Sequence, residues 1–86
     1  MKKKLKFSVS NVRESELLDN IFYECKFCLE NECKFYIDKI NGLTSALYIL
    51  DIIKSPMIIA NYSDVYELMN LINDFFHEYK RDIEEV

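Results

Sequence analysis

Three cysteines and one histidine are the residues of this chain whose types and spacing could hold a metal ion. Cys25, Cys28 and Cys33 form the pattern C-x2-C-x4-C, and His77 could complete a zinc site of three thiolates and one imidazole. Cys25 and Cys28 lie about one helical turn apart, so their thiolates could share one ion. These four residues are the candidate metal ligands.

The context of the cysteines favours a structural role. Cys25 and Cys28 fall on the same helical face as Leu18 and Ile21, where a thiol serves as a small apolar side chain. His77 falls away from the apolar face of its own segment, and reactive C-x-x-C thiolates sit at helix N-termini, whereas this pair is near the end of a helical pattern. We therefore interpret the cysteines as core residues and expect no cofactor.

No other catalytic apparatus is recognisable. A single glycine excludes a glycine-rich phosphate loop, and the single histidine has no nucleophile in a recognisable elbow. Carboxylate pairs are abundant, but on an acidic surface they say nothing about acid-base chemistry. We expect the protein not to be an enzyme.

Residues 63–86 predict a long amphipathic helix, with Ser63 or Asp64 as N-cap and Glu67 completing a capping box. Its apolar face contains Val65, Leu68, Met69, Ile72, Phe75, Phe76, Tyr79 and Ile83. A narrow stripe beside that face contains Asp64, Glu67, Leu71, Asp74, Glu78, Asp82 and Glu85.

This acidic stripe is the candidate partner-binding surface. It is nearly free of lysine and arginine, so its carboxylates repel one another, and a face that only had to be soluble would mix the two signs. Leu71 adds an apolar group among the acids, as in interfaces that steer a basic partner and then dock it. The alternative interpretation is a solvated helix face.

The charge distribution narrows the class of partner. The net charge is −4, yet Lys2, Lys3, Lys4 and Lys6 stand together, which leaves seven basic against fifteen acidic residues in 7–86. We therefore expect no direct binding of nucleic acid and no attraction to anionic membranes. No secretory signal and no apolar run of about 20 residues is recognisable, so we expect a cytoplasmic protein with reduced thiols.

The remaining elements are predicted from periodicity. Leu5, Phe7 and Val9 alternate with polar residues, which predicts a strand, and residues 14–30 predict a helix capped by Asn11 with Glu14 as its capping-box partner. Alternation in Cys33–Ile37 and the dipeptide Asn41-Gly42 predict a hairpin, whose second strand is residues 43–53, followed by a short strand at 57–62. As a helix, residues 43–53 would instead place Thr44, Tyr48, Asp51 and Lys54 on a polar face.

The predicted fold is a single α+β domain, residues 1–86, of order β-α-β-β-β-α, with an antiparallel-rich sheet covered on one face by two helices. The alternative order is β-α-β-α-β-α. Small size, acidity and the lack of catalytic apparatus resemble in type the inhibitors that phages and mobile elements carry against host defence, anti-CRISPR proteins among them. We expect an inhibitor or regulator, monomeric or homodimeric, that contacts a protein target directly, with mimicry of nucleic-acid charge as one mode of action. The rivals are a host regulatory or immunity protein and a zinc or thiol module.

Overall fold

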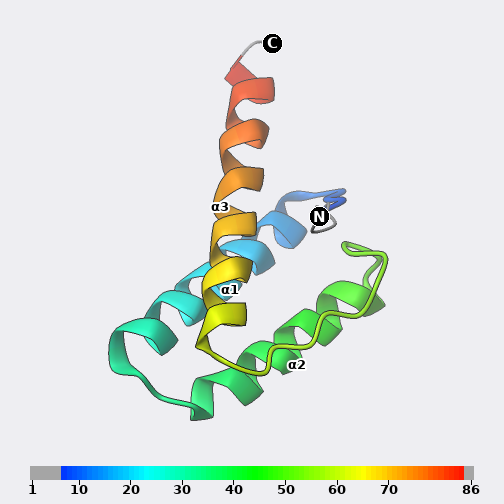
Figure 1. Ribbon diagram of the computed structural model, residues 1–86. Coiled ribbons are helices and arrows are strands. Elements are labelled where there is room, and N and C mark those ends of the chain that lie inside the picture. The colour runs from blue at the N-terminus through cyan, green and yellow to red at the C-terminus, as the bar shows by residue number, and fades with distance from the viewer. Residues whose placement is uncertain (1–6, 85–86) are drawn as a thin grey trace, which may run out of the picture.

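The computed structural model describes residues 7–84, with side chains described for residues 7–78. This part of the chain forms three helices, α1 (Val12–Asn31), α2 (Phe35–Ile49) and α3 (Tyr62–Glu84), and contains no strand. The middle layer is α1, which packs against both other helices and more extensively against α3. Figure 1 shows α3 crossing α1, with its C-terminal end projecting beyond the other helices.

The predicted α+β fold is wrong, and so is the alternative order, because both require strands that the described residues do not form. The decisive segment is α2, where Ile37, Ile40, Thr44 and Leu47 are buried. Their spacing of three and four residues is the helical period. The N-cap residue, Lys34, makes no side-chain capping bond, so the sequence contains no capping signal for the start of α2.

The predicted hairpin turn at Asn41-Gly42 lies inside α2. Gly42 does not have the positive φ that the predicted hairpin turn would require. The role of Asn41 is instead to bond the backbone of Ile59 through its side-chain amide. Its Nδ2 donates to the carbonyl of Ile59 at 2.7 Å, and its Oδ1 accepts from the N–H of Ile59, also at 2.7 Å.

These two bonds hold the connector, which we define as residues 50–61. The chain leaves α2 through Asp51, whose φ is 60°, and the connector then runs back along α2 (Figure 1). Thr44 Oγ1 lies 3.1 Å from the carbonyl of Met57 and 3.0 Å from the carbonyl of Asn41, so its hydroxyl can also donate to the connector. Of the segment predicted as a strand at 57–62, residues 57–60 belong to no helix or strand and Tyr62 begins α3. Side chains of α2 bond the backbone of Met57 and Ile59 in place of a neighbouring strand.

The start of α1 confirms its prediction. Asn11 is the N-cap, and its Oδ1 accepts from the N–H of Glu14 at 3.0 Å. The Glu14 carboxylate in turn accepts from the N–H of Ser10 at 2.8 Å, one residue before the cap. The helix ends at Asn31, and Glu32 follows with a φ of 47°.

The start of α3 repeats the same arrangement, and the predicted cap at Ser63 or Asp64 is wrong. Asn61 Oδ1 accepts from the N–H of Asp64 at 3.0 Å, and the Asp64 carboxylate accepts from the N–H of Ala60 at 2.9 Å. Asp64 therefore has the role predicted for Glu67. The sequence Asn-x-x-acid marks both helix starts.

The N-terminal segment has the predicted alternation without a sheet. Phe7 and Val9 are half-buried and Ser8 is exposed, but the segment's backbone bond to the rest of the chain is from the N–H of Ser8 to the carbonyl of Ile52, at 2.8 Å. The ring of Phe7 packs edge-on against Phe75, with centroids 5.8 Å apart. Leu5 lies outside the described residues.

One core joins all of these parts. Its buried members are Leu18, Ile21, Cys25, Cys28, Ile37, Ile40, Leu47, Ile52, Ile53, Ile59, Val65, Leu68 and Ile72. Three of these isoleucines belong to the connector, so its burial completes the core over α2.

Candidate functional surfaces

The cysteines lie at the end of α1 that approaches α2. Cys25 and Cys28 have no exposed surface, which confirms the prediction that they are core residues. Cys33 follows the helix and is partly exposed, and its carbonyl accepts from the Cys28 thiol at 3.5 Å. The C-x2-C spacing therefore serves packing on one helix face.

The electrostatics of this cluster disfavour thiolate chemistry. Burial, together with the neighbouring Cys28 and the Glu24 carboxylate, raises the pKa of Cys25 to about 12. Burial and Cys33 also raise the pKa of Cys28. Thiolates, not thiols, bind metals and attack electrophiles. Within residues 7–78 no three or more His, Cys, Asp or Glu side chains are grouped so that they could hold a metal ion, and His77 is exposed on α3.

The acidic stripe lies along α3 as the helical period requires, but its members do different things. Asp64 is committed to the helix start, and Glu67 and Leu71 are half-buried. Asp74 and Glu78 are exposed on the C-terminal half of α3. The side chains of Asp82 and Glu85 lie outside the described residues.

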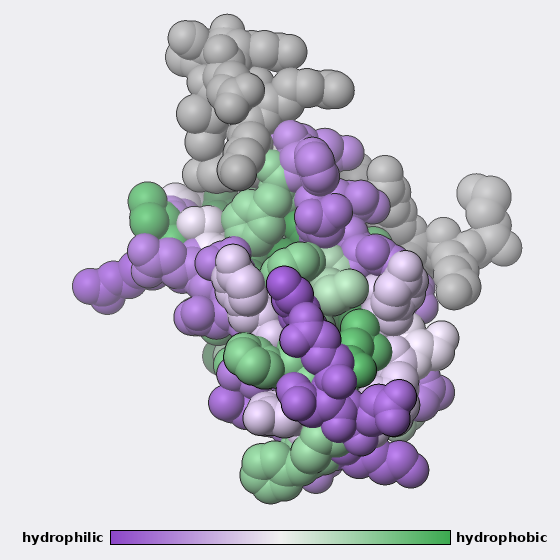
Figure 2. Space-filling model, turned by 90° about the vertical axis from the view of Figure 1, so that its left-hand side faces the viewer, coloured by the Kyte–Doolittle hydropathy of each residue, from purple (hydrophilic) through white to green (hydrophobic). Residues whose placement is uncertain are grey.

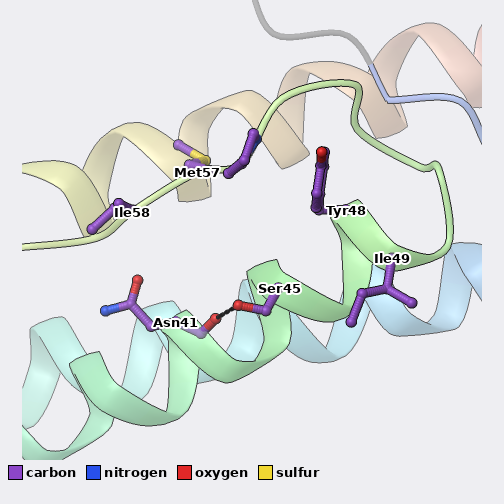
Figure 3. A pocket seen from close by; sticks show the side chains of 7 residues that line it. Asn41, Ser45, Tyr48, Ile49, Met57 and Ile58 are labelled. Carbon is purple, nitrogen blue, oxygen red and sulfur yellow. Dashed lines mark hydrogen bonds between the residues drawn. The ribbon is translucent and has the colours of Figure 1, made fainter.

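A groove that the sequence did not reveal lies between α2 and the connector. Its volume is about 370 Å³. Figure 3 shows side chains of α2 on one wall and of the connector on the other. The lining residues are Asn41, Ser45, Tyr48, Ile49, Pro56, Met57 and Ile58.

The groove presents apolar surface to solvent. Ile49 and Ile58, one on each wall, are 77% and 80% exposed. Two of the polar side chains in the lining are already used, because Asn41 bonds Ile59 and the Ser45 hydroxyl donates to the carbonyl of Asn41 at 2.9 Å (Figure 3). The groove therefore suits an apolar side chain better than a polar ligand.

Sequence reasoning missed this groove for a definite reason. Its walls come from residues 41–49 and 56–58, which overlap the predicted hairpin turn at Asn41-Gly42 and the predicted strands 43–53 and 57–62. In a sheet Ile49 and Ile58 would have been candidates for burial. Had residues 35–49 been treated as a helix, Ile49 would have fallen outside the face formed by Ile37, Ile40 and Leu47. An apolar residue outside the apolar face was the available signal.

Figure 2 shows one face of the molecule coloured by hydropathy. On this face hydrophobic residues reach the surface in small groups that hydrophilic residues separate. Among the described residues no helix is both long enough and apolar enough to cross a membrane. Comparisons with protein-family models, with curated proteins and with solved structures give no match.

Proposed function

We propose that the protein is a small cytoplasmic inhibitor or regulator that binds a basic surface of one target protein through the acidic stripe of α3. One observation carries this proposal. Residues 62–78 contain four carboxylates and no lysine or arginine, and two of these carboxylates, Asp74 and Glu78, are exposed.

The stripe supplies attraction at long range and contact at short range. Exposed carboxylates of one sign raise the rate at which a basic partner arrives, and they do so with no conformational change. Leu71 is half-buried within the stripe and supplies an apolar contact once the partner has docked. A target whose basic surface normally binds nucleic acid would then lose that ligand to a charge mimic, which is the mode expected of an anti-defence protein of phage type.

A charge-reversal pair tests the surface. Asp74→Lys with Glu78→Lys should lose a protein that the wild type captures from a lysate of a low-GC bacterium. The matched control is Glu16→Lys with Asp19→Lys, two exposed acids of α1, which changes the net charge equally. The control should still capture the protein. Equal capture by both variants would remove the stripe from the binding surface.

Salt and nucleic acid refine the result. Capture should weaken as salt rises towards about 0.5 M, because exposed charges are screened over the Debye length. A mimic of nucleic acid should be displaced from its target by duplex DNA or guide RNA, whereas a regulator with its own site should remain bound beside them. Capture that ignores both salt and charge reversal would contradict the proposal.

A further inference from the structure

The outer face of α2 carries a symmetric pattern around its only glycine. Phe35 and Ile49 each stand seven residues from Gly42, and they are 73% and 77% exposed. Residues seven apart lie on one helix face, with a drift of about 20° that helices packed at a shallow angle absorb. Phe35, Gly42 and Ile49 therefore form a single line along the exposed side of α2.

No feature of the described residues requires glycine at position 42. Its φ is not positive, and, apart from its own stretch of helix, no described atom lies within 4 Å of the place where a Cβ would stand. Glycine inside a helix nevertheless costs about 1 kcal/mol relative to alanine. Glycine at a helix surface permits close approach of another backbone, and among residues 7–84 no other segment approaches Gly42.

The charge of this face limits what can cover it. Residues 35–61 contain two aspartates and two lysines and are neutral, whereas α1 has five acidic against two basic residues. Two copies of an acidic chain repel each other through α1 or α3. Residues 35–61 carry no net charge, so two copies can meet through the α2 side without that repulsion.

We propose that α2 is a homodimer interface, in which α2 of a second copy packs antiparallel across Gly42. Two-fold symmetry about Gly42 places Phe35 of each copy against Ile49 of the other, so one pattern serves both sides of the contact. Ile49 also forms the rim of the groove between α2 and the connector, so the ring of Phe35 from the second copy meets the mouth of that groove, opposite Ile58.

The size of the contact limits how tightly two copies can bind. Stable interfaces bury about 800 Å² per partner, and this contact rests on one 15-residue helix and one groove wall from each copy. We therefore expect a dimer that dissociates on dilution, with a dissociation constant of roughly 10 to 100 µM. This interface is separate from the acidic stripe, so it stands or falls independently of the proposed function.

Sedimentation equilibrium between about 1 µM and 1 mM, which brackets weak association, tests the proposal. The wild type should shift from monomer to dimer across this range. Phe35→Glu and Ile49→Lys should each weaken the dimer by about tenfold or more, while Val12→Lys, an exposed apolar position on α1, should not. Circular dichroism should show that each variant keeps its helices.

The register is tested by combining the two changes. Antiparallel packing brings the introduced glutamate of one copy against the introduced lysine of the other, so the double variant Phe35→Glu with Ile49→Lys should recover dimerisation relative to either single variant. Gly42→Leu should remain folded as a monomer, since the site is open, and should lose the dimer. A wild type that stays monomeric near 1 mM, a dimer unaffected by the single variants, or a double variant no better than the singles would overturn the proposal. If the wild type stays monomeric, a helix of another protein is the next partner to test on the exposed face of α2.

Discussion

The two halves of this molecule are specified by different means. In the half formed by α1 and α3, strong amphipathic patterns and paired Asn-x-x-acid starts define the helices locally, and the surface is acidic. In the half formed by α2 and the connector, no cap marks the helix start, the charges balance, and side chains of α2 hold an extended segment through its backbone. Local signals specify the first half, and tertiary contacts specify the second.

The largest expected effect concerns the half built on local signals. Leu68 of α3 has no exposed surface, so Leu68→Ala should lower the free energy of unfolding by about 3 kcal/mol through lost burial and a residual cavity. Tyr66→Ala, at a position 56% exposed on the same helix, should change it by less than about 1 kcal/mol. Urea unfolding measures both, and similar losses for the two variants would contradict the packing described.

A smaller effect separates the connector from the core. Asn41→Ala removes both bonds to Ile59, whose N–H then lies buried without its partner, so we expect a loss of about 2 kcal/mol. Amide exchange at Ile59 should accelerate more than exchange in the middle of α1. Ser45→Ala, which removes an exposed bond to the carbonyl of Asn41, is the control and should cost less than about 1 kcal/mol. Equal exchange in the two variants would show that Asn41 does not hold the connector.

Alkaline pH should act on the half that contains the thiols. Folding raises the pKa of Cys25 from its ordinary value of 9.0 to about 12, so the folded protein keeps a proton that the unfolded chain releases. The free energy of unfolding is therefore greatest below pH 9 and falls as the pH rises towards about 12. Relative to Cys25→Ala, in which the other alkaline titrations remain, the wild type should lose about 1 kcal/mol more between about pH 8 and pH 10. Parallel pH profiles would contradict this assignment.

The smallest effect has the opposite sign. Gly42→Ala should raise the free energy of unfolding by about 0.5 to 1 kcal/mol, because alanine loses less backbone entropy in a helix and the site is open. The measurement belongs at low micromolar concentration, where the chain is monomeric. Ala46→Gly, one turn further along the same helix, should lower it by a similar amount. A destabilised Gly42→Ala would point to a contact within the monomer.

What the sequence could predict follows the same division. The two long helices were found because their apolar residues repeat every three to four positions over more than four turns, and Asn11 with Glu14 located one start correctly. For α3 the cap was placed too late, since Asp64 was treated as the cap when it is the acid that completes one. In α2, alternation around Phe35 and the dipeptide Asn41-Gly42 both favoured strands, and the buried bonds that stabilise the helical alternative join residues 18 positions apart.

The candidate surfaces divide in the same way. The acidic stripe could be predicted because it depends on the period of one helix, and its role as a binding surface stays a prediction. The groove could not be predicted from the sequence, because it exists only where the connector returns along α2 and brings Ile58 opposite Ile49. Surfaces made by one element are visible in a sequence, whereas surfaces made by two require the contact between them.

The position of Asn41 inside α2 has a chemical consequence over time. In a flexible chain, the backbone nitrogen of a glycine that follows asparagine attacks the side-chain amide, ammonia leaves, and water opens the resulting ring to aspartate or isoaspartate. The helix and the two bonds to Ile59 hold the Asn41 amide away from that reaction, so the folded protein should age slowly at this peptide bond. Molecules that spend time unfolded should deamidate here and then refold without the amide that holds the connector. Peptide mass spectrometry after incubation with and without urea would measure how much Asn41 has deamidated in the unfolded and in the folded chain.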